Sequence, residues 1–158
     1  MEGTINDIKI ILTNERIAYL ATSNGKYSDN AVIAFVCDDE LNIFFGSFSD
    51  TLKCKNIDIN PYVAVAVSTL QIHGLARKIT YGSEEYNNKL VVYNKKFPQY
   101  AHVFEKENNE LYVIEPLIVW NYNPSKGEMY RDKIIFSQNY YDDLKPYEAP
   151  IVFEERKK

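Results

Sequence analysis

The order of hydrophobic and polar positions along the chain predicts short strands with isolated helices between them. Residues 16–24, 28–38 and 41–47 each carry a β pattern, separated first by an Asn-Gly pair and then by an acidic turn. Asn-Gly between two such runs is the strongest short signal for a tight hairpin. We therefore expect these three segments to form an antiparallel meander.

The rest of the pattern adds three strands and three helices. We expect strands at 62–68, 71–82 and 110–124, the last interrupted at Pro116, and helices at 4–12, 49–60 and 84–98. Thr4 and Ser49 are the candidate N-caps of the first two helices, because a hydroxyl oxygen can accept from a free backbone N–H. Gly74 predicts a bulge or bend in its strand.

This order of elements is not the alternating βαβ pattern of a parallel sheet. It favours a mainly β fold with short helices, in which six or more antiparallel strands form a closed or half-closed barrel. A length of 158 residues predicts a single domain spanning 1–158. Its core is expected at about 13–124, followed by a polar C-terminal extension at 125–158.

Composition and charge exclude several classes of protein. A net charge of −4 argues against a protein that tracks nucleic-acid phosphates, and no apolar run approaches the length of a membrane span. The first residues lack the pattern of a secretory signal. The two cysteines lie far apart in the sequence, which fits free thiols in a reducing compartment. We therefore expect a cytoplasmic protein with neither nucleic-acid nor membrane partners. The 14% of aromatic residues fits a β-rich core or a site lined with flat rings.

One segment carries candidate chemistry, because a strand ends there in a hydroxyl-rich loop and a helix then begins. Ser47, Ser49 and Thr51 supply hydroxyl groups, and Lys53 supplies a full positive charge one turn inside the helix. A helix start offers free N–H groups and a partial positive charge, which suit a phosphate. The plainer interpretation, a capped helix with a solvated lysine, stays open.

The chain resembles a known family through an ordered set of short motifs. The matching segments are Arg16–Thr22, Gly25, Val32–Phe35, Leu41–Lys53, Asn56, Asn60-Pro61 with Val63, and Gly74-Leu75-Ala76. Together they resemble the pyridoxamine 5′-phosphate oxidase-like, FMN-binding split-barrel family over residues 15–80, and more loosely as far as Trp120. The likeness is closer to the small flavin-binding and nitroimidazole-resistance-type members than to the true oxidases.

The resemblance implies an FMN-binding split barrel that forms a homodimer, with the cofactor at the subunit interface. It places the FMN phosphate where Ser47, Thr51 and Lys53 meet, with Ser49 in the same loop. Family members often carry a second basic residue just before the lysine, where this chain has Leu52. This departure removes one charge-assisted hydrogen bond, worth roughly 1.5–3 kcal/mol unless another group compensates.

The resemblance also implies contacts along the middle strand of the meander. Backbone groups of Val32, Ile33 and Ala34 are expected to border the isoalloxazine ring. The family usually has a basic residue where this chain has Asn30, whose amide can still donate a hydrogen bond to ribityl or phosphate oxygens.

Three distal residues are weaker candidates for cofactor contacts. Gln71, Trp120 and Arg131 resemble a glutamine, a tryptophan and an arginine that similar flavoproteins use at this site. A polar residue at a strand end, a core tryptophan and a surface arginine are the alternatives. The only histidines, His73 and His102, have no spacing that supports a metal site.

The resemblance predicts a flavoprotein that passes electrons from NAD(P)H through FMN to a small acceptor. A flavin carries this chemistry itself, so the chain needs no acid, base or nucleophile, and we assign no catalytic residue. Two other kinds of protein stay open. One is a non-catalytic flavin-binding or stress-type protein, and the other is a relative that binds haem or a deazaflavin.

Overall fold

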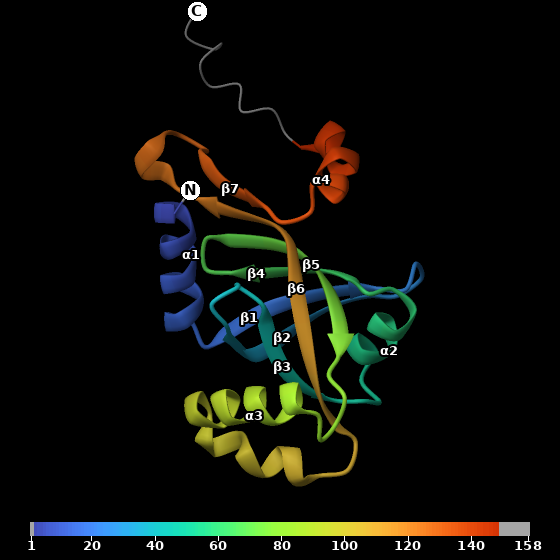
Figure 1. Cartoon of the computed structure of the whole chain (residues 1–158). Coiled ribbons are helices and arrows are strands. Elements are labelled where there is room, and N and C mark those ends of the chain that lie inside the picture. The colour runs from blue at the N-terminus through green and yellow to red at the C-terminus, as the bar shows by residue number, and fades with distance from the viewer. Residues whose placement is uncertain (1, 149–158) are drawn as a thin grey trace, which may run out of the picture.

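The computed structural model describes residues 2–148, which form one antiparallel sheet of seven strands with helices around it (Figure 1). The strands are β1 (Ile17–Ser23), β2 (Ser28–Cys37), β3 (Ile43–Phe48), β4 (Tyr62–Val67), β5 (Leu70–Lys78), β6 (Asn109–Tyr122) and β7 (Arg131–Ile135). The α-helices are α1 (Glu2–Asn14), α2 (Leu52–Ile59), α3 (Glu84–Lys96) and α4 (Gln138–Leu144). Three short 3-10 helices are η1 (Pro98–Glu105), η2 (Pro124–Lys126) and η3 (Lys145–Tyr147).

The sheet closes into a barrel because β3 pairs with β6 as well as with β2. The strand order is β3-β2-β1-β4-β5-β6-β7, so β1 to β6 form the ring and β7 extends beyond it. The mainly β fold with antiparallel strands is therefore confirmed. The predicted meander is confirmed as well, since β1 pairs with β2 and β2 pairs with β3.

Side chains alternate between the inside and the outside of the barrel, as the pleat of a strand requires. Ala18 and Leu20 of β1 are buried, whereas Ile17, Tyr19 and Ala21 beside them are exposed. Large aromatic side chains fill the interior, with Phe35, Phe45 and Tyr112 fully buried and the last two stacked 5.3 Å apart. Part of the high aromatic content therefore serves the core.

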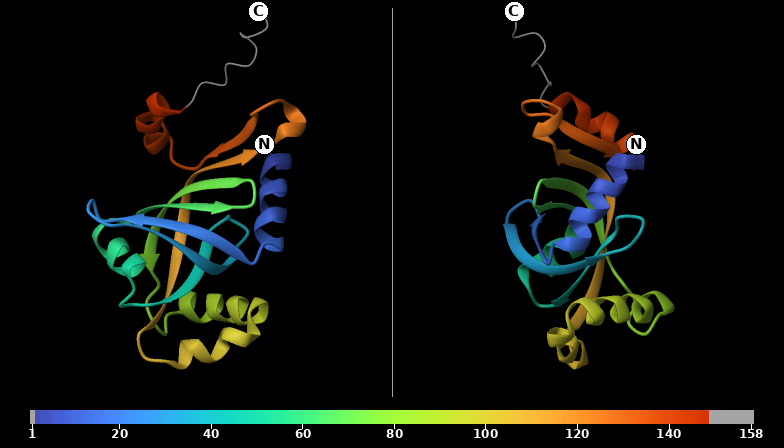
Figure 2. Two further views of the ribbon diagram at one scale, coloured as in Figure 1. Left: turned by 180° about the vertical axis from the view of Figure 1, so that it is seen from behind. Right: turned by 90° about the vertical axis from the view of Figure 1, so that its left-hand side faces the viewer.

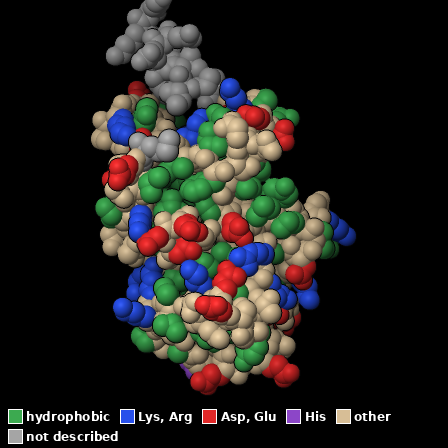
Figure 3. Space-filling view, viewed as in Figure 1, with side chains coloured by type: hydrophobic (Ala, Val, Ile, Leu, Met, Phe, Trp, Pro, Cys, Tyr) green, Lys and Arg blue, Asp and Glu red, His purple; other side chains and the backbone are tan. Residues whose placement is uncertain are grey.

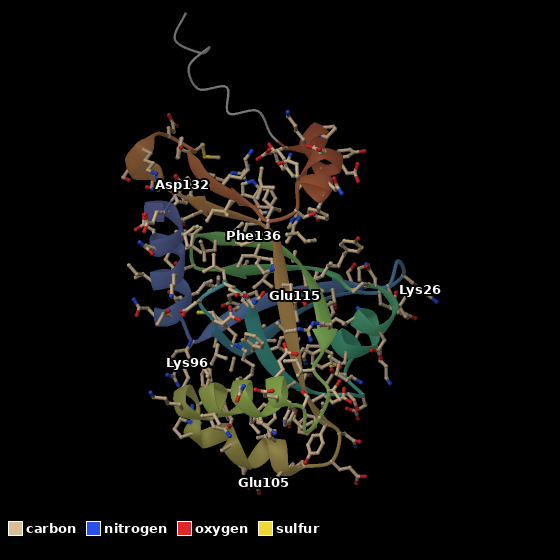
Figure 4. The ribbon with its side chains drawn as sticks, in the orientation of Figure 1. Lys26, Lys96, Glu105, Glu115, Asp132 and Phe136 are labelled. Carbon is tan, nitrogen blue, oxygen red and sulfur yellow. The ribbon has the colours of Figure 1, made fainter. Side chains whose placement is uncertain are left out.

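The helices cover the ends and one side of the barrel (Figures 1 and 2). Helix α3 and η1 lie across one end, α4 and β7 lie at the other, and α1 runs alongside. Lys96, at the end of α3, donates to the backbone oxygen of Glu15, which follows α1 (Figure 4). On the face shown in Figure 3, hydrophobic side chains gather across the middle, and charges of both signs lie below them.

No helix in the described part of the chain is long and apolar enough to cross a membrane.

Both predicted N-caps are wrong. Helix α1 already begins at Glu2, so Thr4 lies inside it. Helix α2 is capped by Thr51, whose backbone is extended and whose carbonyl accepts from the N–H of Lys55. At Ser49 the backbone N–H instead donates to the oxygen of Asn108 at 2.8 Å, so the chain has not yet turned into the helix.

The expected interruption of β6 at Pro116 is also wrong, because the strand runs through it. Pro116 pairs with Gly74 of β5, next to a register shift between His73 and Gly74. Such an irregularity tolerates a residue without an N–H. A Cβ on Gly74 would lie 2.6 Å from a side-chain carbon of Ile114, so the predicted bend requires glycine.

The C-terminal extension holds elements that its polar sequence did not predict. Strand β7 pairs with β6 from Ile118↔Ile135 to Tyr122↔Arg131. Helix α4 follows, and the Ser137 hydroxyl caps it by accepting from a backbone N–H of its first turn. The remainder of the extension, 149–158, lies outside the described residues.

Candidate functional site

The barrel opens where β2 and β3 separate. These strands pair only from Cys37↔Ile43 to Phe35↔Phe45. Continued in register, Ile33 would lie opposite Ser47, but the pairing ends before that point, and Ser47 is paired through its other edge, with Glu110 of β6. Among the described strands, the backbone edge of Val32, Ile33 and Ala34 is therefore paired on the β1 side alone. This backbone edge, which from the sequence we expect to border the isoalloxazine ring, faces the split between β2 and β3.

The start of α2 lies beside the split and forms a small cavity of about 220 Å³. Ser47, Thr51 and Lys53 line it together with aromatic side chains of α3 and η1. The two hydroxyl oxygens lie 3.2 Å apart. Lys53 is the one charged residue among the described lining, so the cavity favours an anion.

The helix start leaves backbone donors available to such an anion. The Thr51 side chain makes no capping bond to α2, so it satisfies none of the first-turn N–H groups. Its hydroxyl donates instead to the Phe48 oxygen at 2.9 Å. The Ser47 hydroxyl has a longer contact of 3.4 Å to the same oxygen, and a bond of that length is easily exchanged for one to a ligand.

Two neighbouring residues do not join this cavity. Ser49, expected in the phosphate loop, is absent from the lining, because its backbone is tied to the loop before β6. Leu52 is 43% exposed, and within residues 2–148 no second cation lines the cavity in place of the basic residue that the family often has there, since Lys55 does not reach it. Lys53 is thus the single full positive charge that this described part of the chain offers to an anion in the cavity.

The other three candidates form a second group, which the structure brings together from β5, β6 and β7. Gln71 pairs directly with Trp120 across the two strands. The Arg131 guanidinium donates to the Gln71 amide oxygen at 3.3 Å and lies 5.8 Å from the Trp120 ring centre. Arg131 therefore lies over the Trp120 ring, and its hydrogen bond to Gln71 fixes the direction of the guanidinium.

A second, open cavity of about 880 Å³ lies beside this group, on the outer face of β1, β2, β4 and β5. We call it the outer cavity. Asn30 and Gln71 line it from opposite sides, and Tyr140 of α4 lines its edge. Asp29 is the one charged residue among the described lining. Asn30 therefore lies with Gln71, in a different cavity from Lys53.

His73 lines the same cavity, and the sequence did not single it out as a site residue. Its Nδ1 lies 2.8 Å from the Tyr140 hydroxyl, and its ring packs edge-on against Trp120 at 5.0 Å. Burial lowers the pKa of His73, which favours the neutral imidazole. The alternation of side chains along β5 is a sequence signal that places His73 on the same face as Gln71. Its partner Tyr140 could not be foreseen, because it belongs to the C-terminal extension, in which the sequence predicted no element.

Glu148 fixes the Trp120 side of this group to the extension. Its carboxylate accepts from Trp120 Nε1 at 2.9 Å, from the Tyr141 hydroxyl at 2.8 Å and from Lys133 Nζ at 3.1 Å. These bonds hold η3 and α4 against β6 and β7, and so keep Tyr140 beside His73.

No family model matches the sequence, and no curated protein matches it. Solved structures do match. A putative pyridoxamine 5′-phosphate oxidase from Listeria innocua is 19% identical, with a TM-score of 0.60 over 73% of this chain and 95% of that one. The haem storage protein HutZ from Vibrio cholerae is 17% identical, with a TM-score of 0.62 over 70% and 88%. An FAD-binding protein from Mesorhizobium loti is 13% identical, with a TM-score of 0.60 over 72% and 90%.

The chain also matches a longer protein of unknown function, Atu2129 from Agrobacterium tumefaciens, with 18% identity and a TM-score of 0.66. The match covers 74% of this chain but only 55% of that one. At such identities the shared property is the fold. This protein has the split-barrel fold of the pyridoxamine 5′-phosphate oxidase-like proteins.

Proposed function

We propose that this protein is a homodimeric flavoprotein that binds FMN between its subunits. The phosphate would bind at Ser47, Thr51 and Lys53 of one subunit. The isoalloxazine ring would lie against Gln71, Trp120 and Arg131 of the other. One observation carries the proposal: Ser47, Thr51 and Lys53 line one cavity of the protomer, whereas Gln71, which binds Arg131 and pairs with Trp120, lines another.

The donor set at the start of α2 fits a phosphate. It combines a lysine, the exchangeable Ser47 hydroxyl and N–H groups that the Thr51 side chain leaves uncapped. A cavity of about 220 Å³ has room for the phosphate but little for the ring system. The ring therefore needs further surface, which the β2 edge at the split and a second subunit can supply.

The outer face of β1, β2 and β4 supports the homodimer. Tyr19, Val32 and Tyr62 are large, exposed apolar side chains on this face, and Ala21 and Ala64 lie among them. Contiguous apolar surface of this kind is typical of an interface. A second copy of the chain would cover it and bring the two groups of site residues together.

FMN would supply the redox chemistry, accepting electrons from NAD(P)H and passing them to a small acceptor. The residues of the chain would bind and orient. Lys53 neutralises the phosphate, Arg131 and Gln71 direct donors at the ring, and Trp120 excludes water from one side. The FAD-binding neighbour from Mesorhizobium loti supports a flavin in this fold.

The first experiment compares FMN binding by the wild-type protein with that of two lysine variants. Lys53→Ala removes the one charge among the described residues that line the cavity at the start of α2, whereas Lys55→Ala removes an exposed charge from the same helix. We expect flavin absorbance to stay with the wild type and Lys55→Ala after desalting. Lys53→Ala should bind roughly 10–100-fold more weakly. Equal binding by both variants, or no binding by the wild type, would overturn the proposal.

Turnover separates an oxidoreductase from a protein that only binds flavin. NAD(P)H added without oxygen should bleach the bound flavin, and a quinone or a nitroaromatic compound should restore its colour. Binding without bleaching would favour the non-catalytic, stress-type alternative.

Haem is the second candidate ligand, because of His73. Its imidazole lies in an aromatic-lined cavity with one nitrogen on Tyr140, an arrangement that orients metal-ligating histidines. The neighbour HutZ is a haem storage protein. Added haemin should then give a Soret band that His73→Ala abolishes and His102→Ala retains. A deazaflavin would be recognised by its own absorption and fluorescence.

A further inference from the structure

The floor of the outer cavity is bounded by two hydrogen-bonding side chains. Asn30 pairs with Ala21, Ala21 pairs with Ala64, and Ala64 pairs with His73, so these four residues form one row across β2, β1, β4 and β5. Three strand spacings, roughly 14 Å, separate the ends of this row. The methyl groups of Ala21 and Ala64 thus lie between the Asn30 amide and the His73 imidazole, and the cavity above them has space for a flat fused ring.

The walls of this cavity favour a neutral ring over a phosphate. Tyr19, Tyr62 and Tyr140 line it, and the last two stack with ring centres 6.0 Å apart. No cation occurs among its described lining residues, and the carboxylate of Asp29 would repel an anion. Aromatic walls and alanines instead offer apolar contact to a conjugated ring.

His73 is poised to donate to such a ring. Its Nδ1 is engaged by the Tyr140 hydroxyl, and Nε2 makes no hydrogen bond with the described residues. When the tyrosine hydroxyl donates to Nδ1, a neutral imidazole carries its proton on Nε2. Tyr140 comes from helix α4, so the C-terminal extension positions the imidazole.

We infer that His73 is a specificity-determining residue for the ring of the bound flavin. Its Nε2–H donates to a carbonyl oxygen or ring nitrogen of a ring lying on the Ala21–Ala64 floor, and Tyr140 positions it. This inference rests on the proposed function, since it takes flavin as the ligand. Helix α4 is then a wall of the site.

Riboflavin and FMN separate ring contacts from phosphate contacts, because they share the ring and differ by the phosphate. Titration of both flavins compares wild type with His73→Phe, His73→Gln, Tyr140→Phe and Lys53→Ala. Tyr81→Phe is the control, since Tyr81 is 80% exposed and lines neither the outer cavity nor the anion cavity. Thermal unfolding of each variant reports on its folding.

We expect His73→Phe to weaken FMN and riboflavin by the same factor, about tenfold, and to shift the bound flavin's absorption. His73→Gln, which retains an N–H donor, should recover part of the loss, and Tyr140→Phe should show a smaller, equal loss for both flavins. Lys53→Ala should weaken FMN alone.

Wild-type affinities in His73→Phe, or a loss confined to FMN, would overturn the inference and leave the proposed function standing. If His73→Phe does not fold, Tyr140→Phe provides the test: an equal loss for both flavins supports the inference, and wild-type affinities or a loss confined to FMN overturn it. A wild-type protein that binds neither flavin would overturn the proposed function, and the inference with it.

Discussion

At the scale of single residues, His73 links the stability of the fold to pH. Burial lowers its pKa below the ordinary value of 6.5, and the hydroxyl of Tyr140 faces it with a raised pKa of its own. The unfolded state therefore takes up a proton more readily than the folded state. This contribution is present at neutral pH and is lost as the pH falls from about 6.5 towards the lowered pKa.

We therefore expect the wild type to lose more stability than His73→Gln between about pH 7.5 and about pH 5. Urea unfolding of both proteins at several pH values measures this difference, and His102 is present in both, so its titration cancels. Parallel pH profiles would contradict the prediction.

At the scale of elements, one buried amide ties α2 to the β1–β2 hairpin. Asn56 is fully buried, and its side chain donates to the Thr22 hydroxyl at 3.1 Å and to the Tyr27 backbone oxygen at 3.3 Å. Since α2 also carries Lys53, these bonds fix the direction of the anion site relative to the barrel. The position of α2 is thus set by hydrogen bonds to a hairpin that lies 29 to 34 positions earlier in the chain.

Asn56→Ala removes the donor to the buried Thr22 hydroxyl and one of two donors to the Tyr27 oxygen, so we expect it to lower the free energy of unfolding by about 1–3 kcal/mol. FMN binding should weaken along with it, because the start of α2 loses its support. Chemical denaturation measures the first effect, and Asp58→Ala, an exposed change on the same helix, serves as the control. The prediction fails if the two variants are equally stable.

At the scale of the whole molecule, the apolar face of β1, β2 and β4 predicts association. Val32 is 60% exposed there, so a charge at this position would be buried without a partner in a dimer. We expect the wild type to have the mass of a dimer in solution, and Val32→Glu the mass of a monomer with weakened FMN binding.

Light scattering measures the mass. Val91→Glu is the matched control, because Val91 is 69% exposed on α3, away from this face. A monomeric wild type, or a dimeric Val32→Glu, would contradict the prediction.

Local signals in the sequence determined most of the elements and one half of the candidate site. The Asn-Gly turn gives the β1–β2 hairpin, with Gly25 in a left-handed conformation that suits it. Ser47, Thr51 and Lys53 lie within seven positions, so a strand end followed by a helix start is enough to bring them together. Ser49 was expected both to cap the helix and to lie in the phosphate loop, and it does neither, because its backbone N–H is bonded to the oxygen of Asn108.

The tertiary structure alone decided how the barrel splits and how the other half of the candidate site forms. No local pattern tells β3 to pair with β6 along its whole length and with β2 only over its first part, since this depends on how the whole ring closes. The weak alternation of the polar extension hides β7 and α4, which gain their stability by packing on β6. His73 and Tyr140 are 67 positions apart, and only antiparallel pairing of β5, β6 and β7 brings them into contact.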